Sequence, residues 1–283
     1  MSVELRALLD GDEVDLCGLM RRCLEHDGGL PMTMGPEMVR QLFLAGEGVC
    51  ARSEHGNLAA AGALHAAPTT GAMEFVGAVD PAHRGRGLGT SLLGWATSVG
   101  GPQLVVRSES LSDPAAQLFA RHGFHGVFEE IVMRRTTSAL PPDGRFEAST
   151  AWSTRSARDF FDAYVASFSA RPGFPGWTLE RWTKEMTSDD DFSSDSSIVV
   201  FLQEMPAGFV LVAGAWIVQV GVVPDARRRG IGTELVSFAL QRIAESGAEA
   251  AWLNVSADNP RAISLYRRLG FEVYGRRGRF RRD

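Results

Sequence analysis

The residues of this chain with the clearest chemical potential form a basic, glycine-rich loop in its second half. Residues 227–232 read Arg-Arg-Arg-Gly-Ile-Gly, which is the pattern R-x-x-G-x-G. Glycine lets the backbone adopt positive φ and pass close to a bulky anion, and arginine stays charged near neutral pH. Loop amides and the N-terminus of a following helix both favour phosphate oxygens. The loop therefore predicts a phosphate site, although a single copy fits a surface turn with solvated arginines equally well.

The elements that must position this loop are an apolar strand before it and a helix after it, and the first half of the chain repeats both. A second loop runs from Arg84 to Gly89, and Arg84 and Arg227 are 143 positions apart. Gly123 and Gly270, each followed by phenylalanine, are 147 positions apart. A repeat this long is a duplicated domain. We expect domains at 1–137 and 147–283, joined by a linker at 138–146.

Strands and helices alternate in both halves. This predicts the α/β class, with an α+β mixed sheet of parallel and antiparallel strands in each of two domains. In the first half we expect strands at 3–8, 49–53, 58–65, 72–79, 104–107 and 127–134, and helices at 12–26, 32–45, 89–99 and 114–122. In the second half a helix begins at Ser156, with Asp159 completing a capping box. It is followed by strands at 198–204, 208–213, 216–223 and 250–255, and helices at 232–245 and 260–269.

A second motif follows the later loop. Residues 259–271 read Asn-Pro-Arg-Ala-Ile-Ser-Leu-Tyr-Arg-Arg-Leu-Gly-Phe, the pattern N-x-x-A-x-x-L-Y-x-x-x-G-F. Together with V-x-P-x-x-R-x-x-G-x-G in the strand and loop, it resembles the GCN5-related N-acetyltransferase (GNAT) family. The resemblance covers both halves, so the chain resembles a tandem GNAT, and its layout is similar to that of the mycothiol synthases.

This resemblance implies that acetyl-CoA lies between the strand at 216–223 and the strand at 250–255. An amide near Val222 is expected to polarise the thioester carbonyl, the amides of 228–233 to hold the pyrophosphate, and Tyr266 to protonate the leaving thiolate. The cofactor-binding residues implied in the second half are Val220, Val222, Val223, Arg227, Arg228, Arg229, Gly230, Ile231, Gly232, Thr233, Asn254, Asn259 and Ala262.

The first half departs from the pattern at the position of the tyrosine. Phe119 stands there, and a phenyl ring donates no proton; the asparagine is also missing. Its loop is intact, so the first half resembles a domain that binds a second CoA or acetyl-CoA without catalysing transfer. The binding residues implied there are Val79, Arg84, Gly85, Arg86, Gly87, Leu88, Gly89 and Thr90.

The resemblance implies an acetyl-CoA-dependent N-acetyltransferase in which a primary amine of a small molecule attacks the thioester directly. An amino sugar, an antibiotic, or an amino acid or peptide amine would each fit; a non-catalytic acyl-CoA-binding or sensing protein is the alternative. No residue stands out as general base. All six histidines and Glu74 lie in the first half, while Glu185 and Glu204 fit solvated surface positions. A water chain to backbone carbonyls would suffice for an amine of low pKa.

Candidate acceptor-binding residues lie between the first helix and the hairpin of the second half. Aromatic rings beside carboxylates suit a cationic amine, and this segment contains Trp177, Trp182, Asp189, Asp190 and Asp191. The alternative is that the tryptophans pack in the core while the aspartates cap a solvated loop.

Charge and cysteine usage argue against other classes. The net charge is −5 and the sequence pI about 5.7, which gives no general attraction to nucleic acid or an anionic membrane. A nucleic-acid role would depend on the arginines at 227–229 and 276–282. The three cysteines have no zinc-ligand spacing, and the sequence lacks a signal segment and a membrane-length apolar run. We expect a cytoplasmic monomer or homodimer that binds no metal, nucleic acid or membrane.

Overall fold

The structure is a computed structural model that describes residues 4–67, 72–138, 141, 144, 146–171 and 173–282. Its described residues form two compact units. Unit 1 extends to Val132 and also contains Ser256–Asp258 and the residues from Tyr274 onward; unit 2 contains Met133–Val255 and Asn259–Val273. The domain bounds 1–137 and 147–283 remain a prediction. Most of the linker expected at 138–146 lies outside the described residues, as does residue 3 of the first expected strand.

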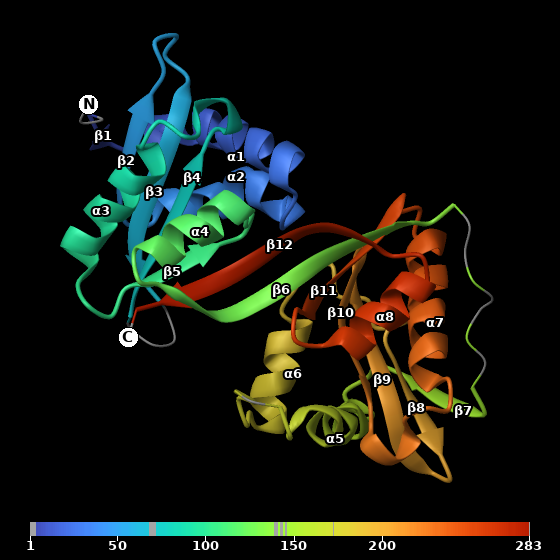
Figure 1. Ribbon diagram of the computed structural model, residues 1–283. Coiled ribbons are helices and arrows are strands. Elements are labelled where there is room, and N and C mark those ends of the chain that lie inside the picture. The colour runs from blue at the N-terminus through green and yellow to red at the C-terminus, as the bar shows by residue number, and fades with distance from the viewer. Residues whose placement is uncertain are drawn as a thin grey trace. The chain divides into compact units, whose positions relative to one another are not determined.

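Unit 1 is a sheet with helices on both faces (Figure 1). Its strand order is β1-β2-β3-β4-β5-β12-β6. The strands are β1 (Arg6–Ala7), β2 (Glu47–Arg52), β3 (Leu58–Ala66), β4 (Met73–Val79), β5 (Val105–Ser108), β6 (His125–Thr136) and β12 (Glu272–Arg281). The helices are α1 (Glu13–Asp27), α2 (Pro36–Val39), α3 (Leu88–Gly100) and α4 (Asp113–Arg121).

Adjacent residues of β4 belong to the two cores of unit 1. Val76 packs with Leu16 and Leu19 of α1, whereas Phe75 packs with Leu92 of α3 and the buried residues around it. Alternation along a strand sends neighbouring side chains to opposite faces, so one apolar strand serves both helical layers. Its end leads directly into the first glycine-rich loop.

Unit 2 repeats this plan, with strand order β6-β11-β10-β9-β8-β7. Its further strands are β7 (Ala148–Ala151), β8 (Ile198–Leu202), β9 (Met205–Ala213), β10 (Trp216–Val222) and β11 (Ala250–Ser256). Its helices are α5 (Ala157–Phe168), α6 (Leu179–Thr187), α7 (Ile231–Glu245) and α8 (Pro260–Arg268). Rings from α5, α6 and β9 form one aromatic core, which includes Phe160, Tyr164, Trp182 and Phe209.

Two local expectations are wrong. Residues 32–45 are not one helix: a 3-10 turn at Pro31–Met34 precedes α2, and a π-helical turn at Arg40–Leu44 follows it. Ser156 makes no capping hydrogen bond of the expected kind. Instead the Ser153 amide donates to Ser156 Oγ at 2.8 Å and the Ser156 amide donates to Ser153 Oγ at 3.1 Å. Ser153, three residues before Ser156, therefore supplies the reciprocal hydrogen bond that was expected from Asp159.

The arginine-rich C-terminal end is a strand of unit 1 and not a free basic tail. β12 pairs antiparallel with β5, from Gly278 opposite Ser108 to Arg281 opposite Val105. Arg277 donates to Glu130 at 2.9 Å and to Glu109 at 3.1 Å. Because carboxylates hold this arginine within the unit, the segment 276–282 offers less free charge to nucleic acid than its composition indicates.

Candidate functional site

The two glycine-rich loops have the same backbone conformation. At the second position of each pattern φ is positive, 75° at Gly85 and 63° at Arg228, and at the fourth it is 84° at Gly87 and 86° at Gly230. Backbone turns of this kind direct amide N–H groups into an anion-binding concavity. Gly87 and Gly230 also stand immediately before α3 and α7, where the first helical amides have no intrahelical acceptor.

The space in front of each helix is open. A Cβ built on Gly87 meets no described atom within 4 Å, and one built on Gly230 meets only Glu234 Oε1, at 4.0 Å. The glycine two positions later is different: a Cβ on Gly232 would lie 3.5 Å from Leu265 of α8. The fourth residue of the pattern therefore leaves room for a ligand, whereas the sixth allows close helix packing.

The first arginine of each loop braces the end of the preceding strand. Arg227 Nε donates to the Val222 carbonyl at 3.1 Å, and a terminal nitrogen donates to the Ser167 carbonyl on α5 at 3.2 Å. Arg84 Nε likewise donates to Val79 at 3.2 Å. The guanidinium thus ties strand, loop and helix together.

A wedge opens between β10 and β11. These parallel strands pair at Trp216 with Trp252 and at Ile217 with Leu253, and a β-bulge interrupts the other edge of β10 between Ile217 and Gln219. Beyond the bulge, the Val223 amide donates to Ala207 on the β9 side at 3.0 Å. Alternation then directs the Val222 N–H to the opposite edge, into the wedge.

Among the buried polar atoms of unit 2 that have no hydrogen-bond partner in the described residues are Asn254 Oδ1 on β11 and Ser167 Oγ on α5. Ser167 lies against Gly221 of β10, where a Cβ would come within 2.9 Å of its hydroxyl. Buried polar groups are normally hydrogen-bonded, because leaving one unpaired costs free energy. These atoms mark places where a polar ligand would gain hydrogen bonds.

Tyr266 lies on α8 and is only 6% exposed. Its ring meets Phe271 edge-on, with centroids 5.9 Å apart. Burial raises the pKa of Tyr266 to about 12, with the Arg171 charge acting in the opposite direction. The phenol is therefore protonated at neutral pH and can donate.

Asn259 is the N-cap of α8, because its Oδ1 accepts from the Ala262 amide at 3.2 Å. Ser112 does the same for α4, accepting from the Ala115 amide at 3.3 Å.

We expect Asn259→Ser to keep both stability and the KM for acetyl-CoA, and Asn259→Ala to lose about 1 kcal/mol of stability. Thermal unfolding and steady-state kinetics test this. A raised KM for acetyl-CoA in Asn259→Ser would show that the amide also contacts the cofactor.

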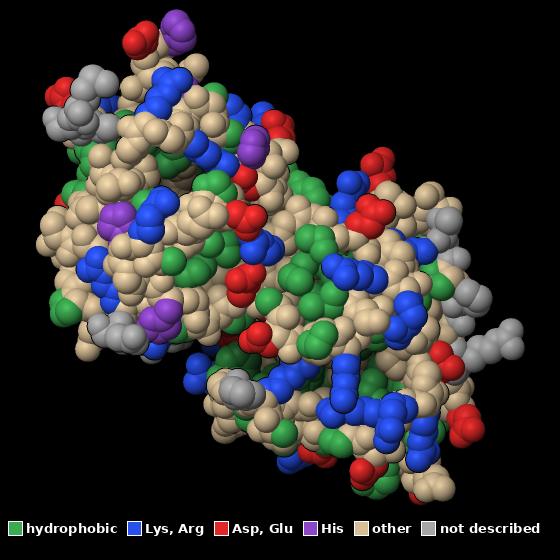
Figure 2. All heavy atoms as spheres, viewed as in Figure 1, with side chains coloured by type: hydrophobic (Ala, Val, Ile, Leu, Met, Phe, Trp, Pro, Cys, Tyr) green, Lys and Arg blue, Asp and Glu red, His purple; other side chains and the backbone are tan. Residues whose placement is uncertain are grey.

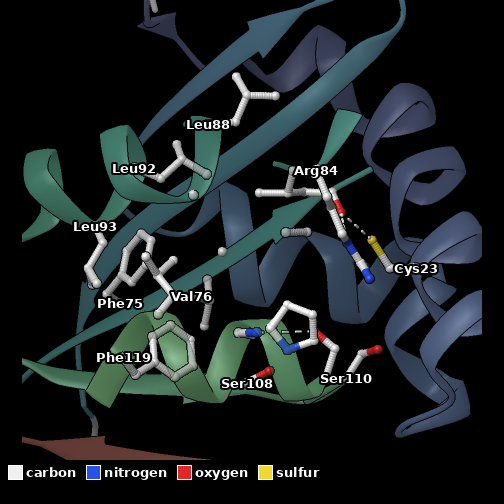
Figure 3. A pocket seen from close by; sticks show the side chains of 18 of the residues that line it. Cys23, Phe75, Val76, Arg84, Leu88, Leu92, Leu93, Ser108, Ser110 and Phe119 are labelled. Atoms are coloured by element: carbon white, nitrogen blue, oxygen red, sulfur yellow. Dashed lines mark hydrogen bonds between the residues drawn. The ribbon is translucent and has the colours of Figure 1, made fainter. Parts of the chain in front are cut away.

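Unit 1 contains a cavity of about 480 Å³ at the corresponding place (Figure 3). Cys23 and Arg84 lie on one side of it, with Phe75 and Phe119 on the other. Phe119 stands at the position of Tyr266 and packs on Phe280, with centroids 4.9 Å apart. The β3–β4 register runs without a bulge from Ala60–Val79 to Ala66–Met73. The cavity is therefore roomy but has no phenol at this position.

Glu74 of unit 1 is a poor candidate for a base. Its carboxylate is 7% exposed and lies 3.7 Å from both His65 and Arg107. The neighbouring His65 side chain is the main cause that holds the pKa of Glu74 below its ordinary value, against the opposing effect of burial. A carboxylate held in this way binds a proton weakly.

The residues expected around the acceptor have different environments. Trp182 is completely buried, and its Nε1 donates to Gln219 on β10 at 3.3 Å, so it packs in the core, as the alternative interpretation held. Trp177 is half-buried under the Arg181 guanidinium. The run 189–191 is an exposed turn in which Asp189 accepts from the Asp191 amide at 2.9 Å.

Comparison with known proteins agrees with this geometry. Residues 158–271 match the acetyltransferase (GNAT) family and residues 45–126 match a GNAT acetyltransferase domain. The mycothiol acetyltransferase of Mycolicibacterium vanbaalenii is 31% identical over 213 residues, 69% of each chain, and that of Mycolicibacterium smegmatis is 28% identical over 96% of each chain. The GCN5-related N-acetyltransferase of Sphaerobacter thermophilus matches in structure with a TM-score of 0.75 and 26% identity, covering 98% of this chain and 94% of that one.

The chain therefore belongs to the GNAT family, and it carries two GNAT domains in tandem. It is an N-acetyltransferase, similar in layout to the mycothiol acetyltransferases. GNAT domains use acetyl-CoA. The positive-φ loops, the open space before α7 and the unpartnered Asn254 oxygen fit the diphosphate and amide groups of that molecule. Among the described residues, no helix has the length and apolar character needed to span a membrane.

Proposed function

We propose that unit 2 transfers the acetyl group of acetyl-CoA to a primary amine of a small molecule, by direct attack of the neutral amine on the thioester. The observation that carries the proposal is the buried, protonated Tyr266 on the helix that packs against the phosphate-type loop, through Leu265 and Gly232. A phenol in this place can give its proton to a leaving thiolate.

The other roles follow from the same geometry. The amides of 228–232 and the start of α7 would hold the diphosphate. The Val222 N–H, directed into the wedge, would donate to the thioester oxygen as charge develops on it. Asn254 Oδ1 would accept from an amide of the pantetheine arm. When bound, acetyl-CoA supplies the activated thioester. Unit 1 would bind a second CoA and leave transfer to unit 2, since Phe119 has no proton to give.

The pH profile of kcat gives one expected outcome. The protonated phenol is the active form, and burial raises its pKa to about 12 from an ordinary value near 10. The rate should therefore rise as the amine loses its proton, and then stay level up to about pH 10. A fall in kcat with a midpoint near pH 9, absent in Tyr266→Phe, would contradict a buried phenol donor.

The acceptor is best sought with a panel. The curated relatives are named mycothiol acetyltransferases, so the free-amine form of mycothiol is the first compound to test, followed by amino sugars, aminoglycoside antibiotics, amino acids and peptides. Thiol release and acetylated product should appear in equal amounts with at least one amine. Binding of acetyl-CoA without thiol release for any amine would favour an acyl-CoA sensor instead.

A further inference from the structure

Behind its glycine-rich loop, the cavity of unit 1 has apolar walls on both faces of the sheet. Leu92 of α3 and Phe119 of α4 line it on one face, with Val76 of β4 nearby (Figure 3). Met20 of α1 and Leu42, from the turn after α2, line it on the other face. All five side chains are buried. A ligand whose phosphates lie on the loop therefore extends its other end among apolar side chains.

Four of the charged side chains that line this cavity neutralise one another in pairs. Asp27 accepts from both terminal nitrogens of Arg84, at 2.8 and 2.5 Å. Glu109 accepts from Arg107 Nε at 2.5 Å. Arg121, which also lines the cavity, is exposed to solvent. Figure 2 likewise shows acidic and basic side chains interspersed on the visible face of unit 1. The paired charges leave the buried walls without an evident preference for an ammonium or an anion.

The polar side chains of the cavity are also satisfied or inert. Among the described residues, no fully buried polar atom that lacks a hydrogen-bond partner belongs to the lining of this cavity. Cys23 Sγ donates to the Val79 carbonyl at 3.5 Å, and burial raises the pKa of the thiol to about 11. Because the thiolate is the nucleophilic form, this thiol would leave a bound thioester intact at neutral pH.

Besides the exchange of phenyl for phenol, two further wall positions are apolar in unit 1 and carry a polar group in unit 2. The 143-residue offset of the loops matches Val76 with Gln219, and the buried faces of α1 and α5 match Met20 with Tyr164, 144 positions apart. Trp182 donates to Gln219 at 3.3 Å and stacks on Tyr164, with centroids 5.1 Å apart. Unit 2 thus has an amide, a phenol and a large ring where the corresponding walls of unit 1 are unbranched or aliphatic.

We propose that unit 1 binds a CoA thioester whose acyl chain is apolar and longer than acetyl, such as butyryl or hexanoyl, and holds it without transferring it. This rests on the proposal that unit 1 binds a second CoA. The loop would hold the diphosphate, as in unit 2, and the buried walls would cover the acyl chain. The stabilisation rises with each CH2 group that is removed from water. Unit 1 would thereby bind a different acyl-CoA from the one that unit 2 consumes.

A chain-length series tests the proposal in the full chain carrying Gly230→Asp, whose remaining CoA site would lie in unit 1. Calorimetry with acetyl-, butyryl- and hexanoyl-CoA should give affinities that rise about three- to four-fold per CH2 group, roughly a hundred-fold over the series. Succinyl-CoA matches butyryl-CoA in chain length but ends in a carboxylate. It should bind at least about ten-fold more weakly than butyryl-CoA, because burying a carboxylate costs free energy. Gly87→Asp should abolish this dependence on chain length.

Substitutions in the wall place the preference in the cavity. In the Gly230→Asp background, Val76→Gln introduces the residue of unit 2 and should remove most of the dependence on chain length, with the affinity for free CoA kept. Met20→Tyr makes the second such change, and circular dichroism checks that each variant is folded. Val14→Gln, at a position of α1 that is 81% exposed, is the matched control and should keep the full dependence.

Three results would overturn the proposal, and each is distinct from a failure of acetyl transfer, which is measured as amine acetylation by the wild type. Equal affinities for free CoA and all its thioesters would leave a CoA site in unit 1 but no acyl-chain site. Tighter binding of succinyl-CoA than of butyryl-CoA would identify an anion site instead. A folded Gly230→Asp chain that binds no CoA compound would remove both the acyl-chain site and the second CoA.

Discussion

Replacing Tyr266 with phenylalanine is expected to lower kcat by roughly ten- to a thousand-fold, the range for loss of a general acid. The leaving thiolate would then have to take its proton from water. The fold should tolerate the change, because unit 1 carries a phenylalanine, Phe119, at the equivalent buried position. The affinity for acetyl-CoA should change little, since the hydroxyl is proposed to act on the transition state.

Steady-state kinetics and calorimetry on the same preparation separate these effects. A lower kcat with an unchanged dissociation constant for acetyl-CoA is the expected combination. A normal kcat would remove Tyr266 from the chemistry, and a loss of cofactor binding equal to the loss of rate would make it a binding residue. Phe119→Tyr in unit 1 is the matched change. It should not restore activity to Tyr266→Phe, because β4 pairs with β3 without the bulge that β10 has against β9, where the wedge of unit 2 opens.

Gly230→Asp should abolish cofactor binding in unit 2 and, with it, turnover. The new carboxylate would stand immediately before α7, where the space is open and a diphosphate would lie. Two like charges at about 4 Å cost about 4 kcal/mol at an effective dielectric constant of about 20, so affinity should fall roughly a thousand-fold. The φ of 86° adds backbone strain for any side chain.

Gly230→Asn separates charge from strain, because asparagine has the same shape, no charge and a better tolerance of positive φ. It should bind acetyl-CoA much more tightly than Gly230→Asp does. Calorimetry gives both affinities, and circular dichroism checks that each variant is folded. Equal losses in the two variants would attribute the effect to the backbone and would count against a diphosphate at this position.

The loops and the exchange of Tyr266 for Phe119 could be read from the sequence because both are local. A glycine that needs positive φ, as at Gly87 and Gly230, leaves a fixed spacing in the chain. The apolar strands before the loops and the helices after them also have a clear periodicity, so β4, β10, α3 and α7 lie close to their expected positions. The tandem organisation followed from the repeat of these features.

The role of β12 could not be read in this way. Its pairing partner, β5, is about 170 residues earlier, with Gly278 opposite Ser108, and no local pattern specifies so distant a partner. The alternating arginines also hide the strand, because their carboxylate partners, such as Glu109 and Glu130, come from other elements. The short strand β7 was missed for the same reason, because its partner is β8, with Ala148 opposite Phe201. The helix α6 was also missed, although its N-cap, Thr178, is a local signal.

Within the site, the missed features depend on partners that only the fold supplies. Arg227 was expected to serve the cofactor, but no feature of the sequence indicated that it donates to the Val222 and Ser167 carbonyls. Ser167 itself looked like one more residue on a helix. The repeat of the buried face of α1 in α5 was the available signal for Ser167, which stands 144 positions after the buried Cys23.

The central claim, that unit 2 performs the acetyl transfer, is tested most directly by the rate of amine acetylation in Gly87→Asp and Gly230→Asp, measured side by side by mass spectrometry of the product. The two glycines have nearly the same φ and the same place before a helix, so the strain and the added charge are matched. Turnover should survive in Gly87→Asp and disappear in Gly230→Asp. The reverse outcome, activity lost in Gly87→Asp and kept in Gly230→Asp, would place the reaction in unit 1 and contradict the account.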